Sequence, residues 1–523
     1  MKFTLGDPGD LGVPLSAAVA LAGLIAVAHG QNAAPRYDVV EKSIAELAAA
    51  LNARTVTSRQ LTAEYLARID AYDQRGPSLN SMIVVNPRAL DEAAALDRER
   101  ASRGARGPLH GIPLVIKDNY ETIDLPTTAG SIALKGLITG RDAFQVRKLR
   151  DAGVVIVGKT NLHEFARGIT TISSLGGQTR NPYDPTRNPG GSSGGTGAAV
   201  AANFAAAGMG SDTCGSIRYP AAHNSLVGLR PTLGLSSRTG IIPLSHSQDV
   251  GGPLAKTVRD VALLMDATVG PDPEDPTTRA GIGKYPAGGS SYVKTLDGAS
   301  LQGARLGTFG VLFGDAPEDQ HAGSVVRAAI EEMTSAGASF SPVVVEDPPK
   351  EADGVAIIRH EFKFDLDAYF AKTPKAPVRS LAEVLEKHLH HPSLENAFRT
   401  SADVPTLDSD AYRAIVARNA SLRQALLDVM DRARVVALVY PTLRRTASTI
   451  GEPQAGGNCA ASAATGLPAI TVPAGFADDG MPVGIEFLGR PFSEVDLLKL
   501  AVAYERATHH RRAPALLPPL NRD

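Results

Sequence analysis

The sequence predicts an α/β fold whose core is a mixed, largely parallel sheet covered by helices on both faces. Short apolar runs of strand length alternate with Gly-rich turns and small-residue helical segments, most clearly at residues 112–116, 154–157 and 205–210. This alternation indicates a sheet that is buried on both sides. The chain has 51 glycines and 36 prolines, which suit tight turns, and 43% hydrophobic residues, which is enough for a core.

The N-terminal part of this fold is expected to be helical. Residues 43–73 show the periodicity of two helices, with Ser43 and Ser58 as their N-caps, and a third helix follows a short strand, so that helices occupy about residues 43–105. The sheet core is then expected over about residues 106–270.

Beyond the core, turn-forming residues cluster in the stretch GPDPEDPT and predict a boundary. A more polar and more helical variable lobe is expected over about residues 300–440, with a strand–helix–strand pattern inside it. The chain then returns to the sheet over about 441–510, where Asp479-Gly480 is a hairpin turn signal. We interpret residues 29–523 as a single domain.

The charge and cysteine content exclude several classes of protein. The chain has 53 basic and 55 acidic side chains, a net charge of −2, so it offers no basic field for a nucleic acid. Two cysteines exclude a disulfide scaffold and a cysteine-rich zinc module. The histidines near residue 390 and at 509–510 lack metal-ligand spacing, so neither a metal nor another cofactor is predicted.

The N-terminus carries a targeting signal. Residues 13–28 are an apolar run without charge that ends in Ala26-Val27-Ala28, and its length suits a signal-peptide core better than a membrane span. We expect residues 1–28 to be a signal peptide and the mature protein to be periplasmic or secreted, without stable membrane association. The alternatives are an uncleaved anchor and a buried N-terminal helix in a cytoplasmic protein.

Two motifs match known patterns only formally. Residues 153–160 satisfy the P-loop pattern, but the four variable positions are Val, Val, Ile and Val, which indicate a strand and not a phosphate-binding loop. Residues 191–195 satisfy the G-x-S-x-G pattern of a nucleophile elbow, with Ser193 as the nucleophile. That elbow requires a strand running directly into it, whereas the nearby Pro189 argues for a loop, so an α/β-hydrolase is a weak alternative.

One charged side chain is costly to bury unless it has a function. The segment HGIPLVIKDN (110–119) ends an apolar run in Lys117, where desolvation would lower the pKa of the amine and make it a base. The alternative is an ion pair with the adjacent Asp118.

Two Gly- and Ser-rich segments complete the candidate site. In PGGSSGGTG (189–197), glycines flank paired hydroxyls and permit unusual backbone conformations, although an ordinary flexible turn would look the same. In GSDTCGSIRYP (210–220), a strand ends in a turn whose amides precede Ser216, as an oxyanion hole requires. The alternative for Ser216 is a helix N-cap.

Together these segments resemble the amidase signature family. Ser192 and Ser216 lie 24 residues apart, which is the family's spacing between its two catalytic serines. The stretches GKTNLHEFA, NPYDPTRNP and TGLPAITVP resemble further family motifs. The resemblance covers about residues 40–510 and is weakest over the variable lobe.

The resemblance implies a role for each matched residue. Ser216 would be the nucleophile, Ser192 the bridging serine after a cis peptide bond, and Lys117 the base, a Ser-cisSer-Lys triad that supplies the adjacent base a serine needs. The backbone amides expected to bind the oxyanion are those of Thr213, Cys214, Gly215 and Ser216. The residues expected to support this centre from outside are Ser193, Asp212, Arg187 and Arg218.

The implied function is hydrolysis of a carboxamide, or of a related aryl ester or carbamate, in a small-molecule substrate through a seryl acyl-enzyme without a cofactor. The alternatives are the catalytic subunit of a tRNA-dependent amidotransferase and a binding protein of the same fold; a homodimer is left open. Cys214 stands where the family usually has glycine. We expect Cys214 and Cys459 to be free, buried thiols, with a disulfide between them as the alternative if the protein is exported.

Overall fold

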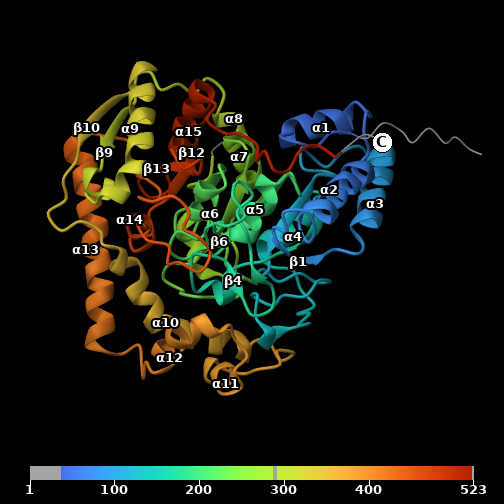
Figure 1. Ribbon diagram of the computed structural model, residues 1–523, viewed down its shortest axis with the longest axis horizontal. Helices are drawn as coiled ribbons and strands as arrows, with labels where there is room; N and C mark the ends of the chain where they lie inside the picture. The colour runs from blue at the N-terminus through green and yellow to red at the C-terminus, as the bar shows by residue number, and fades with distance from the viewer. Residues whose placement is uncertain (1–36, 287–290, 521–523) are drawn as a thin grey trace, which may run out of the picture. The chain divides into compact units, whose positions relative to one another are not determined.

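One eleven-stranded mixed sheet organises this computed structural model, which describes residues 37–286 and 291–520 (Figure 1). In sheet order the strands are β1 (Met82–Val85), β3 (Val155–Thr160), β2 (Pro113–Lys117), β6 (Ala207–Asp212), β8 (Val250–Ala255), β7 (Val227–Arg230), β12 (Ala469–Phe476), β13 (Pro482–Leu488), β11 (Ala437–Pro441), β9 (Arg305–Thr308) and β10 (Ser339–Pro342). A separate hairpin pairs β4 (Ile172–Ser173) with β5 (Gly177–Gln178).

Parallel pairing is found in two blocks of the sheet, β3-β2-β6 and β11-β9-β10, and the remaining neighbours are antiparallel. The expected α/β fold with a mixed sheet is therefore confirmed. The strand–helix–strand pattern in the variable lobe forms as β9, α9 and β10, and the hairpin β12–β13 turns at the expected Asp479-Gly480.

The helices are α1 (Ile44–Asn52), α2 (Ser58–Tyr72), α3 (Ala89–Arg103), α4 (Phe144–Asp151), α5 (Gly194–Ala201), α6 (Arg218–His223), α7 (Val258–Thr268), α8 (Tyr292–Thr295), α9 (Gln320–Ser335), α10 (Glu351–Ala371), α11 (Leu381–Glu386), α12 (Glu395–Ala402), α13 (Asp410–Ala433), α14 (Ala460–Ala463) and α15 (Glu494–Thr508). Ser43 caps α1 as expected. The cap of α2 is Thr57 and not Ser58, whose hydroxyl instead donates to the Gly111 carbonyl.

Residue alternation along β2 shows how both faces of the sheet are covered. Leu114 and Ile116 pack in the apolar cluster that includes α4 and α7, whereas Val115 packs in the cluster that includes α5. Since side chains alternate along a strand, Lys117 falls on the same face as Val115. The polar end of β2 is thereby directed to the side of the sheet where α5 begins.

The C-terminal half of the variable lobe is helical. Helices α10, α11 and α12 pack against one another, and α13 packs on α10 (Figure 1). None of the helices in the described parts of the chain is long and apolar enough to cross a membrane. The expected signal peptide, residues 1–28, lies outside the described residues.

The expectation of two free thiols is wrong, because Cys214 and Cys459 form a disulfide with a Cα–Cα distance of 5.1 Å. The Cys459 amide donates to the Tyr219 hydroxyl at 2.8 Å, which fixes the segment before α14 beside the start of α6. Gly354 of α10 covers the disulfide, and a Cβ at that position would lie 2.3 Å from the Cys214 sulfur. These contacts join residues distant in sequence, so the pairing depends on the complete fold.

Candidate active site

Lys117 lies fully buried at the end of β2 and contacts hydroxyls but no carboxylate. Its Nζ lies 2.7 Å from Ser192 Oγ, 2.9 Å from Ser211 Oγ and 3.3 Å from the Ser211 carbonyl oxygen. The alternative ion pair with Asp118 does not form, because Asp118 pairs with Lys159 at 3.2 Å. The structure therefore brings Lys117 and Ser192 together, as the sequence predicted.

The surroundings of Lys117 lower the pKa of its amine. Burial lowers that pKa to about 7, although the negative charges of Asp212 and Asp249 act in the opposite direction. Loss of solvation penalises the charged form of an amine, and here no contacting carboxylate compensates. A substantial neutral fraction is therefore present near pH 7, and a neutral amine can accept a proton.

The loop that carries Ser192 is packed too tightly to be a flexible turn. The Gly191–Ser192 peptide bond is cis, as the family resemblance implied, and Gly190 has φ +76°. The Thr171 hydroxyl donates to the Gly190 carbonyl at 2.7 Å. A Cβ on Gly191 would lie 2.7 Å from the carbonyl carbon of Ile169, so the glycine is needed for this close backbone contact.

Ser216 lies in the turn between β6 and α6, next to the Ser192 loop. The Ser193 amide donates to the Ser216 carbonyl at 3.1 Å. The N-cap of α6 is Ile217 and makes no side-chain cap bond, so Ser216 is not a helix cap. Within the described chain, the Ser216 hydroxyl has no hydrogen-bond partner, and the residue is 3% exposed.

The turn before Ser216 presents backbone amides, but not all four are available. The Gly215 amide donates to Asp212 Oδ1 at 2.8 Å and is therefore occupied. The amides of Thr213, Cys214 and Ser216 have no acceptor among the described residues. The positive φ of the turn, +89°, falls on Gly215, so the cysteine at position 214 does not take a left-handed conformation.

Asp212 organises this turn through a buried network of charges. Besides Gly215, its carboxylate accepts from Arg218 Nε at 3.1 Å and Arg230 Nη1 at 3.0 Å, and Arg218 Nη1 also donates to Glu486 Oε1 at 2.6 Å. All these side chains are fully buried. Burial would raise the Asp212 pKa, but Arg218 and Arg230 outweigh it and hold that pKa well below its usual value.

The other two supporting residues differ in their distance from this centre. The Ser193 hydroxyl donates to the Ser211 carbonyl at 3.1 Å, beside Lys117. Arg187 instead donates to the Ala447 carbonyl at 2.8 Å and pairs with Asp479 at 3.0 Å. Arg187 therefore fastens the stretch NPYDPTRNP to the C-terminal part of the chain and is not brought to Lys117.

Sequence reasoning missed several polar residues of the site. Ser211 lies in the segment GSDTCGSIRYP, but no role was expected for it. Its Oγ accepts a hydrogen bond from Asn119 Nδ2 at 2.9 Å, beside Lys117. The Thr213 hydroxyl donates to Asp249 Oδ1 at 2.5 Å, and no motif surrounds Asp249. Ser211 could have been predicted from its position near the end of the strand that leads to Ser216. Asp249 could not, because only the complete fold brings it beside Thr213.

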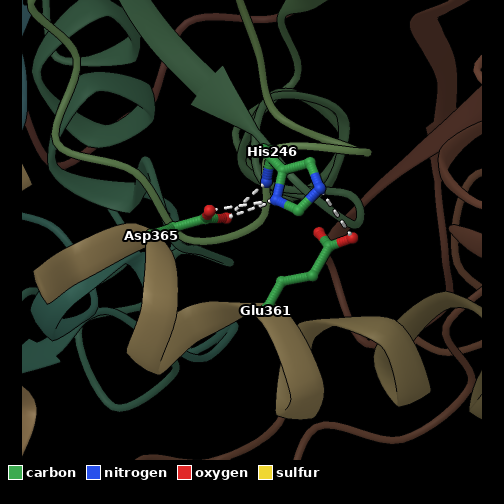
Figure 2. Close-up of side chains that lie close together, drawn as sticks. All are labelled: His246, Glu361 and Asp365. Atoms are coloured by element: carbon green, nitrogen blue, oxygen red, sulfur yellow. Dashed lines mark hydrogen bonds and ion pairs between the residues drawn. The ribbon is translucent and has the colours of Figure 1, made fainter. Parts of the chain in front are cut away.

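One group of potential metal ligands occurs within the described residues, formed by His246, Glu361 and Asp365 (Figure 2). Their donor atoms are already used by the protein: His246 Nδ1 lies 2.9 Å from Asp365 Oδ1, and Glu361 accepts from the Tyr412 hydroxyl at 2.7 Å and from the Ser245 hydroxyl. The group is thus a hydrogen-bonded contact that joins the loop before β8 to α10.

Comparisons with known proteins show the family to which the chain belongs. The family model described as Amidase matches residues 60–498. The native peptide amidase from Stenotrophomonas maltophilia has 39% identity and a TM-score of 0.83, covering 91% of this chain and 99% of that one. A "probable amidase" of Arabidopsis thaliana is 35% identical over 92% of this chain and 93% of its own length. A glutamyl-tRNA(Gln) amidotransferase subunit of Alkalilimnicola ehrlichii is 36% identical over 91% and 99%.

The fold, the family match and the peptide amidase neighbour indicate an amide-hydrolysing enzyme of the α/β class. More specifically, the chain belongs to the amidase signature family, as its motifs predicted.

Replacing Arg218 with methionine should strongly destabilise the protein, because Glu486 would lose its only cationic partner among the described residues and Asp212 would keep only Arg230. Removing one partner of a buried ion pair typically costs about 3–5 kcal/mol. Urea denaturation measures the loss. Arg98→Met, on the exposed face of α3, is the matched control and should change stability by less than about 0.5 kcal/mol. Equal, small losses in both variants would contradict the prediction.

Proposed function

We propose that this protein hydrolyses a carboxamide through a seryl acyl-enzyme, with Ser216 as nucleophile, Ser192 as proton relay and Lys117 as general base. The observation that carries the proposal is the contact of 2.7 Å between Lys117 Nζ and Ser192 Oγ in a buried setting that lowers the lysine pKa to about 7. An amine poised near neutral pH matches the requirement for general-base catalysis.

In the proposed mechanism, Ser216 Oγ attacks the amide carbonyl carbon while its proton passes to Ser192, whose own proton passes to Lys117. The amides of Thr213, Cys214 and Ser216 stabilise the oxyanion. As the C–N bond breaks, the ammonium of Lys117 returns the proton through Ser192 to the leaving amine. Water then attacks the acyl-enzyme with the same relay, releasing the acid and restoring Ser216.

For the substrate, we propose the amide of a peptide or of a similar acyl compound. The peptide amidase of Stenotrophomonas maltophilia supports this proposal, since the similarity extends over 99% of its chain. Cys214 also packs in an apolar cluster with Ile242, Ile358 and Phe165, which suits an apolar acyl group. Aryl esters and carbamates belong to the same panel of test substrates, because they form the same acyl-enzyme.

A second candidate is the catalytic subunit of a tRNA-dependent amidotransferase, which the 36% identity to the amidotransferase relative supports. The disulfide counts against it, because disulfides rarely persist in the cytosol, where such an enzyme works. A binding protein without catalysis is less well supported, because Lys117, Ser192 and Ser216 are all present and the first two are in contact.

Ser216→Ala should abolish both turnover of an amide panel and labelling by a fluorophosphonate, since the nucleophilic oxygen is removed while the fold is kept. Mass spectrometry of labelled peptides identifies the modified serine, and circular dichroism checks the fold. Ser193→Ala is the matched control and should still be labelled at Ser216. Labelling at Ser193 in the Ser216→Ala variant would move the nucleophile and favour the elbow alternative.

The rate should rise with pH as the Lys117 ammonium loses its proton. Because burial lowers that pKa to about 7, kcat/KM should increase about tenfold per pH unit below 7 and level off above it. Lys117→Ala should lower the plateau by at least about 10²–10⁴. Steady-state rates from pH 5 to 9 measure both, and a rate that falls steadily from pH 6 to 9 would indicate a different base.

We also propose export to an oxidising compartment, with a mature N-terminus at or near His29. The apolar run ending in A-x-A supports this proposal, and a disulfide is compatible with it. Cell fractionation with N-terminal sequencing should find the processed chain outside the cytoplasm. Thiol titration under denaturing, non-reducing conditions should then find no free cysteine. Intact Met1 on a cytoplasmic protein with two free thiols would refute export.

A further inference from the structure

Arg167 carries a guanidinium that no group in the described protein neutralises. Its Nε is buried without a hydrogen-bond partner, and no described carboxylate or carbonyl accepts from the rest of the group. Its terminal nitrogens are not among the buried, unpartnered atoms, and the residue keeps intermediate exposure, so the outer edge of the guanidinium remains reachable. A buried donor without a partner is destabilising unless a ligand completes it.

Other deeply buried guanidinium groups in the described chain differ from this one. Arg218 and Arg230 pair with carboxylates, Arg511 pairs with Glu41, and Arg68 donates to four backbone carbonyls. Burial alone acts on Arg167 and lowers its pKa to about 10, with no carboxylate raising it. The cation remains charged at neutral pH, so the protein maintains a partly desolvated positive charge there.

The position of Arg167 connects this charge to the active site. It begins the segment 167–171, whose residue Ile169 lies against Gly191, directly before Ser192. The same segment wraps His163, whose Nδ1 accepts the amides of Thr170 and Thr171. The first four residues of the segment are half-buried, whereas Lys117, Ser192 and Ser216 are buried, so the segment leads from the surface to the Ser192 loop.

One neighbouring side chain, His163, is influenced by both cations. Burial lowers the pKa of the His163 imidazole to about 3, and the charges of His391, Arg167 and Lys117 act in the same direction. His163 is therefore neutral at working pH and adds no further positive charge. Within the described residues no anion completes this arrangement, so a ligand with a negative charge can do so.

We infer that Arg167 is a specificity residue that binds a carboxylate of the amide substrate. This inference rests on the proposed function and narrows its substrate class to amides that bear a carboxylate. The planar guanidinium suits a carboxylate, which it can bind through two parallel N–H···O bonds. The carboxylate belongs either to the acyl part or to the leaving group, and matched substrates distinguish the two.

The experiment compares kcat/KM for two pairs of amides. In the acyl pair, succinamate is compared with butyramide; in the leaving-group pair, 4-acetamidobenzoate is compared with 4-methylacetanilide. Wild type, Arg167→Gln and Arg167→Lys are measured, with Arg98→Gln on exposed α3 as the control for loss of one positive charge. If wild type is labelled at Ser216 but turns over neither member of a pair, a protection assay replaces the ratio of rates. It compares how strongly succinate and the neutral 1,4-butanediol each slow the labelling of Ser216.

Arg167→Gln should lower the carboxylate-to-neutral ratio in one pair by about 10- to 100-fold, as expected for loss of a charge-assisted hydrogen bond. Arg167→Lys should restore part of the ratio, and Arg98→Gln should leave it unchanged. Equal loss for both members of each pair, or no change in either, would overturn the inference while leaving the amidase function intact. Absence of labelling and of all turnover in wild type would instead refute the proposed function.

Discussion

The buried Asp212 carboxylate is the interaction on which the rest of the site depends. It ends β6 and binds the amides of Gly215 and Ile217 at 2.8 and 3.1 Å, which shapes the turn that presents Ser216. Arg218 and Arg230 neutralise it, and Arg218 extends the network to Glu486 on β13. Because β6, β7 and β13 lie in one sheet, this network ties the turn to three strands at once. Burying these charges is tolerable only because each carboxylate lies against a guanidinium at close distance, so the turn has little freedom to move.

The second constraint is the exclusion of anions from direct contact with Lys117. Asp118, its neighbour in sequence, points to Lys159, and Asp212 is occupied by two arginines. Lys117 therefore keeps only hydroxyl and carbonyl neighbours, and desolvation dominates its titration. Helix α5 makes this burial possible by packing directly on β6, where Cβ atoms at Gly208 and Gly210 would come within 2.6 Å of Thr196 and 2.8 Å of Ser193. The close packing of α5 on β6 therefore contributes to the burial that lowers the pKa of Lys117.

The sequence predicted what depends on local pattern. The apolar run ending in Lys117, the Ser43 cap and the Asp479-Gly480 hairpin each carry their signal within a few residues, and each was found. Contacts between distant segments were predicted poorly. The Cys214–Cys459 disulfide was only the alternative to two free thiols, and the contacts of Arg218 with Glu486 and of Asp249 with Thr213 were missed, because all three depend on the complete fold. The use of the Gly215 amide by Asp212 was also missed, because a turn's amides are equivalent in sequence until a side chain is known to bind one of them.

The division between core and variable lobe has a chemical counterpart. The residues proposed to transfer protons belong to the sheet core, whereas α10 of the variable lobe reaches the turn before Ser216 through Gly354, which packs on the sulfur of Cys214. Further along α10, Asp365 and Glu361 contact His246 in the loop before β8, which fixes the helix against the core (Figure 2). Ile358 of α10 and Ile242 of that loop lie in the same apolar cluster as Cys214. A change of side chain in α10 can therefore alter the apolar space beside Cys214 without disturbing Lys117, Ser192 or Asp212. The lobe with the weakest family resemblance can thus vary independently of the residues proposed to carry out the reaction.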